Sequence, residues 1–418
     1  MLITKTYKYR IYPTQKQESR MTNHMNMSRY VWNWHLGGMM KQYKDSKTFP
    51  SMIEQQNLLP KLKEEKPWFK NVYSMVLQDA NRRLHKALIT FFKSKKEGNT
   101  DTGFPKYKKK GQWNSLNYTD YGRNMPSYFS TMNRKIGKEK ANNHIPVPKI
   151  GFVKIKRHRE LPKGAVVKTM SIIKDGCKWF TCFTFQFEKA VKEVPKQDLL
   201  THSVGIDMGL NDFVYTSGGL SEPLPKFYRK REKHLAKVQR KLSKAKKRSA
   251  RYYKLLKAVQ KAHYRVKMQR QEFHHQVANW LLKHYDLIAI EDLAIKNMIR
   301  KAKPKQDEEG NFTRNGRKAK SGLSKSIANA GWYSFRVILE NKAKELGKVV
   351  VAIAPQYTSQ KCSGCGATVK KALSVRTHSC NECGFTANRD HNAAINILTL
   401  GLESLGLYAY DAPTIPLG

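Results

Sequence analysis

Three acidic residues lie in local patterns that could bring their carboxylates together at one site. Asp207 ends the apolar run of Val-Gly-Ile-Asp-Met-Gly, and Glu291 ends that of Leu-Ile-Ala-Ile-Glu-Asp-Leu. Short runs of β-branched and apolar residues predict buried strands. Asp390 opens an apolar-periodic helix in Asn-Arg-Asp-His-Asn-Ala-Ala-Ile-Asn-Ile. Three carboxylates that converge at strand ends and a helix start can hold two divalent metal ions, and two such ions can cut a phosphodiester.

Two of the three acids also have a purely structural explanation. Asp207 before a glycine is compatible with a turn in which the side chain caps its own backbone, and Asp390 is compatible with a helix N-cap. Glu291 would be costly to bury at a strand end without a cation. Strand alternation sends Glu291 and its neighbour Asp292 to opposite faces, so only one of the two can join the site. The combination of three acids, and no single one of them, indicates a metal-dependent site.

Four cysteines form a second group with the spacing of metal ligands. The pairs Cys362/Cys365 and Cys380/Cys383 have two residues inside each pair and 14 residues between the pairs. Two such knuckles supply four thiolates for one tetrahedral Zn²⁺. An iron–sulfur cluster and a redox dithiol are the alternatives. Four protein ligands leave no open coordination position, so we expect this zinc to be structural.

The charge of the chain predicts its partner. Lys and Arg number 79 against 32 Asp and Glu, which gives a formal net charge of +47. Such a surface attracts polyanions, so we expect nucleic acid and not a membrane. With no membrane-spanning apolar run and no signal-peptide core, we expect a cytoplasmic protein with reduced cysteines. Charge alone would also suit a ribosomal or chromatin protein, and the acidic triad distinguishes a nuclease from those classes.

Positive charge is densest between positions 226 and 270, where 19 Lys and Arg accompany one acid, Glu232. An apolar seam that includes Leu235, Val238 and Leu242 predicts a helix or helical hairpin and not a disordered tail. A solvated face is the simplest explanation of a charge run, but this ratio favours nucleic-acid contact. We assign that contact to Arg240, Lys244, Lys247, Arg248 and Arg251, and to the basic segment of Lys106, Tyr107 and Lys108.

Three kinds of element must position these residues. An alternating strand before Pro13 is followed by helices over residues 14–93, with two apolar stripes that predict a bundle core. Short alternating segments between 103 and 187 suggest a small β-barrel that includes the first strand, with the helices inserted into it. From Ser203 the order is strand, turn, strand, long helix, parallel strand, helix, strand, cysteines and helix. That order is typical of a ribonuclease-H-like domain.

The sequence therefore predicts a multidomain α+β protein with a zinc-binding module inserted into its α/β domain. We expect a linker over 189–201, a mobile loop over the site at 296–325, and poor order after Leu400. The predicted domains are a β-barrel (1–13 plus 101–195), a helical domain (14–100), a nuclease domain (196–361 plus 384–400), a zinc insertion (362–383) and a tail (401–418).

The chain resembles the TnpB family, the transposon-encoded RNA-guided nucleases regarded as ancestors of type V CRISPR effectors. The resemblance rests on Gly-Ile-Asp-Met-Gly, Ile-Glu-Asp-Leu, Thr-Ser-Gln-Lys-Cys-Ser-Gly-Cys-Gly and Cys-Asn-Glu-Cys-Gly-Phe-Thr-Ala-Asn-Arg-Asp-His-Asn-Ala-Ala-Ile-Asn-Ile. Upstream, Gly-Phe-Pro-Lys-Tyr-Lys and the opening Tyr-Lys-Tyr-Arg-Ile-Tyr-Pro-Thr-Gln are similar to further family segments. The resemblance therefore covers nearly the full length.

This resemblance implies a specific activity. It implies that Asp207, Glu291 and Asp390 are the RuvC triad, with two Mg²⁺ or Mn²⁺ ions, and that the four cysteines hold one Zn²⁺ in a target-nucleic-acid-binding insertion. A wedge-type barrel and a helical recognition domain would bind a guide RNA from the transposon end. A monomer on this RNA, in the prokaryotic cytoplasm or nucleoid, would recognise a target-adjacent motif through residues around 73–83 and 107–118. One RuvC site would then cut both strands of double-stranded DNA.

Three other functions remain open on the sequence alone. The chain could be a CRISPR-associated compact type V nuclease, which only the genomic neighbourhood distinguishes from a transposon-encoded one. It could be a non-cleaving RNA- or DNA-binding regulator, although a damaged triad would then be expected. It could also be an unguided transposase or resolvase, which would act without RNA as a dimer.

Overall fold

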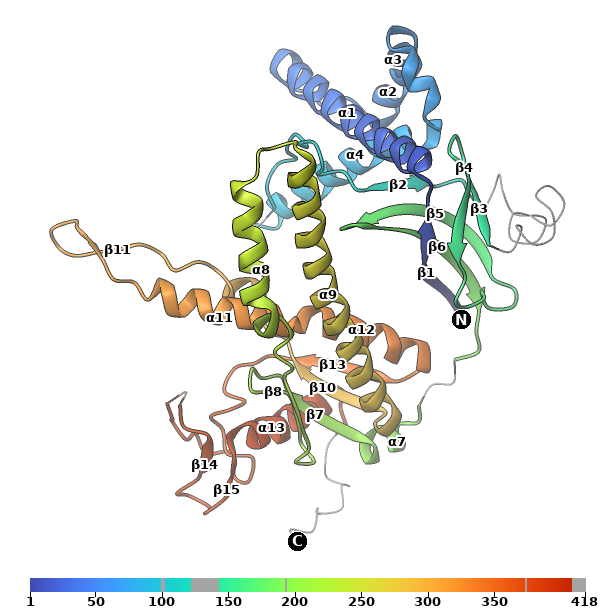
Figure 1. Ribbon diagram of the computed structural model, residues 1–418. Helices are drawn as coiled ribbons and strands as arrows, with labels where there is room; N and C mark the ends of the chain where they lie inside the picture. Colours follow the sequence, from blue (N-terminus) through green and yellow to red (C-terminus); the bar gives the residue numbers. More distant parts are fainter. Residues whose placement is uncertain (99–101, 122–142, 192–193, 373, 408–418) are drawn as a thin grey trace. The chain divides into compact units, whose positions relative to one another are not determined.

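The computed structural model describes residues 1–98, 102–121, 143–191, 194–372 and 374–407. The chain divides into two compact units, Met1–Lys189 and Ala190–Gly418, whose elements are labelled in Figure 1. Across the described ranges, no helix combines the length and the apolar character that crossing a bilayer requires.

The first unit contains a six-stranded antiparallel sheet in the order β2-β5-β6-β1-β4-β3. The first strand is central, between β6 and β4, so it is not an edge strand. The sheet is curved (Figure 1), but β2 and β3 at its two ends do not pair with each other in the described residues. The predicted barrel is therefore a curved open sheet. Its strands are β1 (Leu2–Tyr12), β2 (Ser115–Tyr118), β3 (His144–Val147), β4 (Gly151–Lys156), β5 (Val166–Asp175) and β6 (Lys178–Glu188).

Helices between β1 and β2 form the bundle that the apolar stripes predict. Thr14 begins the first helix with a capping box, in which its side chain accepts from the Gln17 amide. The stripe of α1 is buried from Met21 to Met39, and that of α4 is buried as far as Leu88. Phe92, the last apolar residue of that stripe, is 46% exposed. The helices are α1 (Gln15–Ser46), α2 (Met52–Asn57), α3 (Leu59–Glu65), the 3₁₀ helix η1 (Pro67–Asn71) and α4 (Ser74–Lys96).

The second unit contains a five-stranded mixed sheet in the order β13-β10-β7-β8-β9. The strands β13, β10 and β7 are parallel, and β8 and β9 continue the sheet antiparallel. This is the succession of strands that the sequence predicts, with β9 as an unexpected addition. The strands are β7 (Ser203–Asp207), β8 (Asp212–Thr216), β9 (Ser221–Pro223), β10 (Leu287–Glu291) and β13 (Val349–Ile353).

Helices cover both faces of this sheet, as buried parallel strands require. On β10, Ile288 and Ile290 pack in the core with α9 (Ala250–His284) and α12 (Trp332–Leu346). Leu287 and Ala289 pack in the other core, with α13 (Arg389–Ser404). Strand alternation thus divides the apolar residues of β10 between two helical layers.

Three segments differ from the predictions. The expected linker contains α7 (Lys196–Thr201), which buries Leu199 in the core beside α13. The expected tail begins inside α13, and Leu407 beyond it is also buried. The rest of the tail, residues 408–418, lies outside the described residues, and the predicted domain boundaries stay predictions.

The expected loop at 296–325 contains regular structure. It contains α10 (Ile295–Met298), the hairpin β11 (Lys305–Gln306) and β12 (Phe312–Thr313), and most of α11 (Arg317–Ala330). The anchoring apolar side chain of α11 is Ile327, which follows the polar stretch. Residues 296–325 therefore show no helical period of apolar residues in the sequence.

Candidate active site and metal centre

The first two acids lie side by side at one edge of the sheet. Strands β7 and β10 end at Asp207 and Glu291, and their parallel pairing matches Ile206 with Ile290. Residues in register on parallel strands point to the same face. Asp207 lies two residues after Gly205, so strand alternation puts both on the same face. This face is covered by α13, because a Cβ at Gly205 would lie 2.1 Å from the Ala394 carbonyl oxygen of that helix. Both carboxylates therefore lie on the side of the sheet that carries α13.

The third acid lies in the first turn of α13. The N-cap is Asn388, whose side chain accepts a 2.8 Å hydrogen bond from the Asp390 amide. The alternative explanation of Asp390 as the cap is therefore wrong. Asn and Asp are both preferred N-cap residues, and here the Asn two positions earlier takes that place. The Asp390 carboxylate contacts Arg376 at 3.6 Å.

Electrostatics connect the three acids. Burial, together with the charges of Glu291 and Asp390, raises the pKa of Asp207 to about 8, while Arg389 opposes the shift. Burial also raises the pKa of Glu291. Carboxylates in this environment ionise readily only beside a cation. A divalent metal would supply that charge, so the donor set fits the Mg²⁺ or Mn²⁺ that the sequence predicts.

Glu291 and Asp292 point in opposite directions. Glu291 is buried on the α13 side. Asp292 has a side chain that is 64% exposed, and it pairs with Arg336 of α12 on the other side of the sheet. The structure therefore brings Glu291 to Asp207, and it does not bring Asp292 there.

Glu291 also makes one buried contact that the sequence does not predict. The Thr358 hydroxyl donates a 2.6 Å hydrogen bond to Glu291 Oε1, and both side chains are buried. Thr358 belongs to the Thr-Ser-Gln stretch before the first cysteine pair. The one signal in the sequence was that this polar triplet follows shortly after a buried strand, where a polar side chain can reach the site.

The neighbours of Asp390 on α13 have structural contacts. Asn392 lies two residues after Asp390. It is fully buried, accepts from the Ser363 amide at 2.9 Å and donates to the Lys361 carbonyl at 2.8 Å, so it packs. His391 Nε2 hydrogen-bonds the Ser217 carbonyl at 3.0 Å. These bonds fix the start of α13.

The four cysteines form a compact cluster. Cys362 Sγ lies 3.6 Å from Cys383 Sγ, Cys365 Sγ lies 3.6 Å from Cys380 Sγ, and all four sulfur atoms are within 4.8 Å of one another. Four sulfurs at about 2.3 Å from one tetrahedral ion would stand about 3.8 Å apart, so the cluster fits zinc. Among the described residues, these cysteines are the one group of three or more His, Cys, Asp or Glu side chains whose ligand atoms all lie within 4.8 Å of one another. The carboxylates of the acidic triad do not form a second group by this distance.

The basic run of 226–270 is a helical hairpin, as predicted. Helix α8 (Phe227–Lys244) and α9 run on either side of a short turn at 245–249. The five predicted side chains are all exposed and lie at or near this turn: Arg240, Lys244, Lys247, Arg248 and Arg251. They have no ion pair with an acid in the described residues.

The second predicted contact segment is held on α1. Trp32 Nε1 donates to the Lys106 carbonyl at 3.1 Å, and Asn33 exchanges two hydrogen bonds with the Lys108 backbone. The Lys108 ammonium lies 4.9 Å from the centre of the Trp32 ring. Lys106 and Tyr107 remain exposed.

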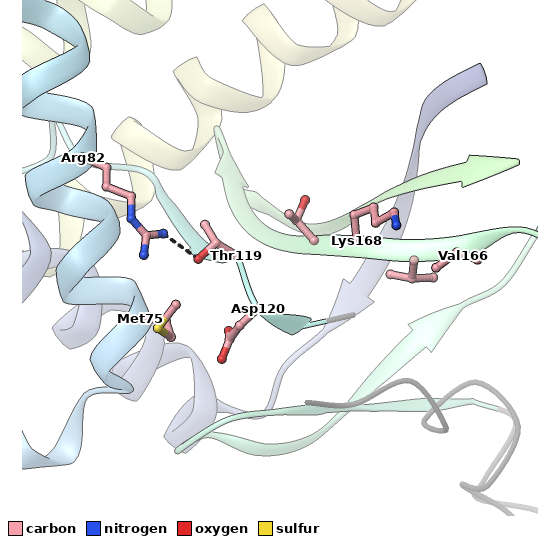
Figure 2. Close-up of a pocket in the computed structure, with 8 residues that line it drawn as sticks. Met75, Arg82, Thr119, Asp120, Val166 and Lys168 are labelled. Atoms are coloured by element: carbon pink, nitrogen blue, oxygen red, sulfur yellow. Dashed lines mark hydrogen bonds between the residues drawn. The ribbon is translucent and has the colours of Figure 1, made fainter. Parts of the chain in front are cut away.

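The first unit also contains a pocket of about 480 Å³ between α4 and the sheet. Figure 2 shows Arg82 of α4 directed at Thr119, to which its guanidinium donates a 2.8 Å hydrogen bond. Asp120 lies beside them and accepts a 2.6 Å bond from Tyr73. The pocket is lined by Met75, Arg82, Thr119, Asp120 and residues 166–169.

Fold and site together define a mixed α/β protein of more than one domain, with a zinc-compatible cluster of four cysteines near buried acids. Family models match residues 186–302 ("Probable transposase"), 332–397 ("Cas12f1-like, TNB domain") and 1–48 ("Helix-turn-helix domain"). The first two ranges contain all three acids. Residues 1–48 form β1 and the single helix α1, and not two helices.

Curated relatives match over nearly the full length. The chain is 30% identical to the putative RNA-guided DNA endonuclease InsQ of Escherichia coli K12, over 94% of this chain and 92% of the relative. It is 29% identical to a putative RNA-guided DNA endonuclease of Streptomyces pristinaespiralis, over 96% and 90%. Among solved structures, a Cas12f1–sgRNA–target DNA complex aligns at 14% identity and a TM-score of 0.46, over 95% of this chain and 98% of that one. The chain belongs to the TnpB family.

Proposed function

We propose that this protein is an RNA-guided DNA endonuclease of a transposable element. The observation that carries the proposal is the full-length similarity to relatives named for that activity, combined with an intact set of three acids at the strand ends and helix start. A non-cleaving regulator would not need three acids so close that the charges of Glu291 and Asp390 raise the pKa of Asp207. The family model described as "Probable transposase", which matches residues 186–302, supports a transposon origin over a CRISPR one.

The proposed active site is a RuvC-type site made of Asp207, Glu291 and Asp390, in a ribonuclease-H-like domain. These carboxylates would hold two Mg²⁺ or Mn²⁺ ions, which when bound would activate water and stabilise the leaving oxygen. The chain itself fixes the ligands. Strand pairing sets Asp207 beside Glu291, and the Asn388 cap and the His391 bond set the first turn of α13 that carries Asp390. No serine, cysteine or tyrosine nucleophile is required.

The proposed partners are a guide RNA and double-stranded target DNA, bound by one copy of the protein. The exposed basic side chains at the α8–α9 turn, and the segment Lys106–Tyr107–Lys108, would contact phosphates. The four cysteines would hold one structural Zn²⁺.

The pocket in Figure 2 is the proposed reader of the target-adjacent motif. It offers the guanidinium of Arg82 and the carboxylate of Asp120, which together can donate and accept hydrogen bonds at base edges. Two of its lining residues, Met75 and Arg82, fall in the range around 73–83 that the resemblance implies for recognition of that motif.

Expression of the protein with its native flanking DNA tests the proposal. The purified protein would be treated with nuclease, and the protected RNA sequenced. A discrete RNA that maps to the adjacent element end, with a variable 3′ segment, is the expected result. A heterogeneous mixture of cellular RNA would contradict the proposal, because the charge of +47 would then bind RNA without selection.

A further inference from the structure

The buried contact between Thr358 and Glu291 belongs to a continuous hydrogen-bonded path. The Thr358 hydroxyl lies 2.6 Å from Glu291 Oε1 and 3.3 Å from the Pro355 carbonyl oxygen. Its single proton is directed at the carboxylate, because the 2.6 Å contact is much the shorter of the two. Glu291 Oε1 thereby accepts one hydrogen bond, which uses one of its two lone pairs.

The backbone around Thr358 is held by α13. The Asn396 side-chain amide donates 2.8 Å hydrogen bonds to the carbonyls of Thr358 and Lys361. One turn earlier, Asn392 bonds the Lys361 carbonyl and the Ser363 amide, inside the first cysteine pair. The helix that carries Asp390 therefore also holds the segment that contacts Glu291.

This path joins three parts of the unit that are distant in sequence. It starts at the knuckle of Cys362, passes through Asn392 and Asn396, and ends at the carboxylate of Glu291. Its side chains are largely withdrawn from solvent: Thr358 is 3% exposed and Asn392 0%. Buried hydrogen bonds of this kind restrict rotamers, because breaking one leaves a desolvated polar group unpaired.

We propose that Thr358 is a positioning residue for the metal-binding carboxylate of Glu291, and that the cysteine knuckle braces it through Asn392 and Asn396. This inference rests on the proposed function. With Oε1 held by the hydroxyl, the carboxylate is fixed in one rotamer and Oε2 is left to bind metal. Partners of metal ligands that act in this way change metal affinity by about 10- to 100-fold when they are removed.

The test compares Thr358→Val with Thr358→Ser. Valine matches the shape of threonine without the hydroxyl, and serine keeps the hydroxyl without the methyl group. Mn²⁺ binding to the purified, zinc-containing protein would be followed by electron paramagnetic resonance, with Asp207→Ala as the blank for binding outside the site. We expect Thr358→Val to bind at least about tenfold more weakly than wild type, and Thr358→Ser to bind within about threefold of it.

Two further measurements separate positioning from general stability. Thermal unfolding and zinc content should be similar in the two variants. Asn396→Leu, which leaves the hydroxyl in place but removes its brace, should also weaken Mn²⁺ binding. The inference would be overturned if Thr358→Val and Asn396→Leu both bound Mn²⁺ with the same affinity as wild type.

The half-saturating Mg²⁺ concentration for DNA cutting gives the second readout. It should rise by about tenfold in Thr358→Val, with a smaller loss of rate at saturating Mg²⁺. If wild type fails to cut guided DNA while the Mn²⁺ difference persists, the proposed function fails and the positioning role stands. If wild type cuts and the variants match it in metal dependence, the positioning role fails alone.

Discussion

At the residue scale, the site depends on how closely α13 approaches β7. Gly205 lies directly under this helix, and a Cβ there would stand 2.1 Å from the Ala394 carbonyl oxygen and 2.5 Å from the Leu398 amide nitrogen. Both are backbone atoms, so neither can move aside alone. The absence of a side chain at one position thus lets the helix bring Asp390 toward Asp207.

The Gly205→Ala variant should therefore be destabilised by about 1–3 kcal/mol, because the helix must shift away from the sheet. Urea unfolding measures this change. Gly218→Ala is the control, since the nearest atom to its Cβ is 4.0 Å away. Equal unfolding midpoints for the two variants would contradict the packing described for α13.

Two histidines buried in the first unit make its stability depend on pH. Burial, aided by the charge of Arg20, lowers the pKa of His24 to about 4, and burial, aided by His85, lowers the pKa of His35 to about 4. The unfolded chain binds these protons near pH 6.5. Their neutral forms therefore contribute stability above pH 6.5, and it is lost as the pH falls toward 4.

We expect the free energy of unfolding to fall between pH 6.5 and 4 by on the order of 3 kcal/mol for each histidine, as an upper estimate. Chemical unfolding at a series of pH values measures it. The His35→Gln variant should show a shallower slope over the same range, and an unchanged slope would argue against the burial of His35.

At the element scale, the sequence predicted those elements whose apolar pattern is strong. The stripe from Met21 to Leu36 was visible because burial repeats at a helical spacing. The strands that end at Asp207 and Glu291 were visible because each is a short continuous apolar run. Helix α11 was not visible, because its anchor Ile327 comes at its end. The short α7 was missed because one buried residue, Leu199, holds it.

For the site, the sequence indicated the acids and cysteines but not their supports. Thr358, Asn388 and Asn396 each act through a hydrogen bond to a residue that is distant or ambiguous in sequence. No local pattern encodes such a contact, because Thr and Asn are common in loops and caps. Tertiary structure alone shows which polar residues are buried together.

The cysteine module gives a prediction at this scale. Cys380→Ser removes one of four thiolates, so zinc content should fall from about one ion per chain toward zero. The midpoint of thermal unfolding should fall as well. Cys177→Ser is the control, since Cys177 belongs to the first unit, which does not contain the cluster. A stable protein that lacks zinc after the Cys380 change would remove the structural role.

The α8–α9 turn gives another prediction at the element scale. The combined variant Lys244→Gln, Lys247→Gln and Arg251→Gln should bind the guide RNA more weakly at every salt concentration. The slope of log affinity against log salt should fall by about 0.7–0.9 for each lost phosphate contact. Lys283→Gln, at the other end of α9, should leave this slope unchanged. An unchanged slope in the combined variant would mean that the turn does not contact phosphate.

At the scale of the whole molecule, net charge and site chemistry have different roles. The charge of +47 provides affinity for nucleic acid of any sequence. The three acids are among only 32 acidic residues, and they are brought together in a chain whose charge is mostly positive. A protein of this kind requires a guide to select its target, because its general affinity selects none.

The most direct test of the account compares two adjacent carboxylates. Glu291→Gln and Asp292→Asn each remove one charge, from side chains on opposite faces of the same sheet. Purified protein with its guide RNA would be incubated with Mg²⁺ and double-stranded DNA that carries the target and its adjacent motif.

We expect Glu291→Gln to lose cutting of both strands by at least about 10³-fold while its RNA affinity is unchanged, because the metal site loses a ligand. Asp292→Asn should cut at a rate close to that of wild type, since it loses only a surface ion pair with Arg336. Cutting by the Glu291 variant at the wild-type rate would contradict the account.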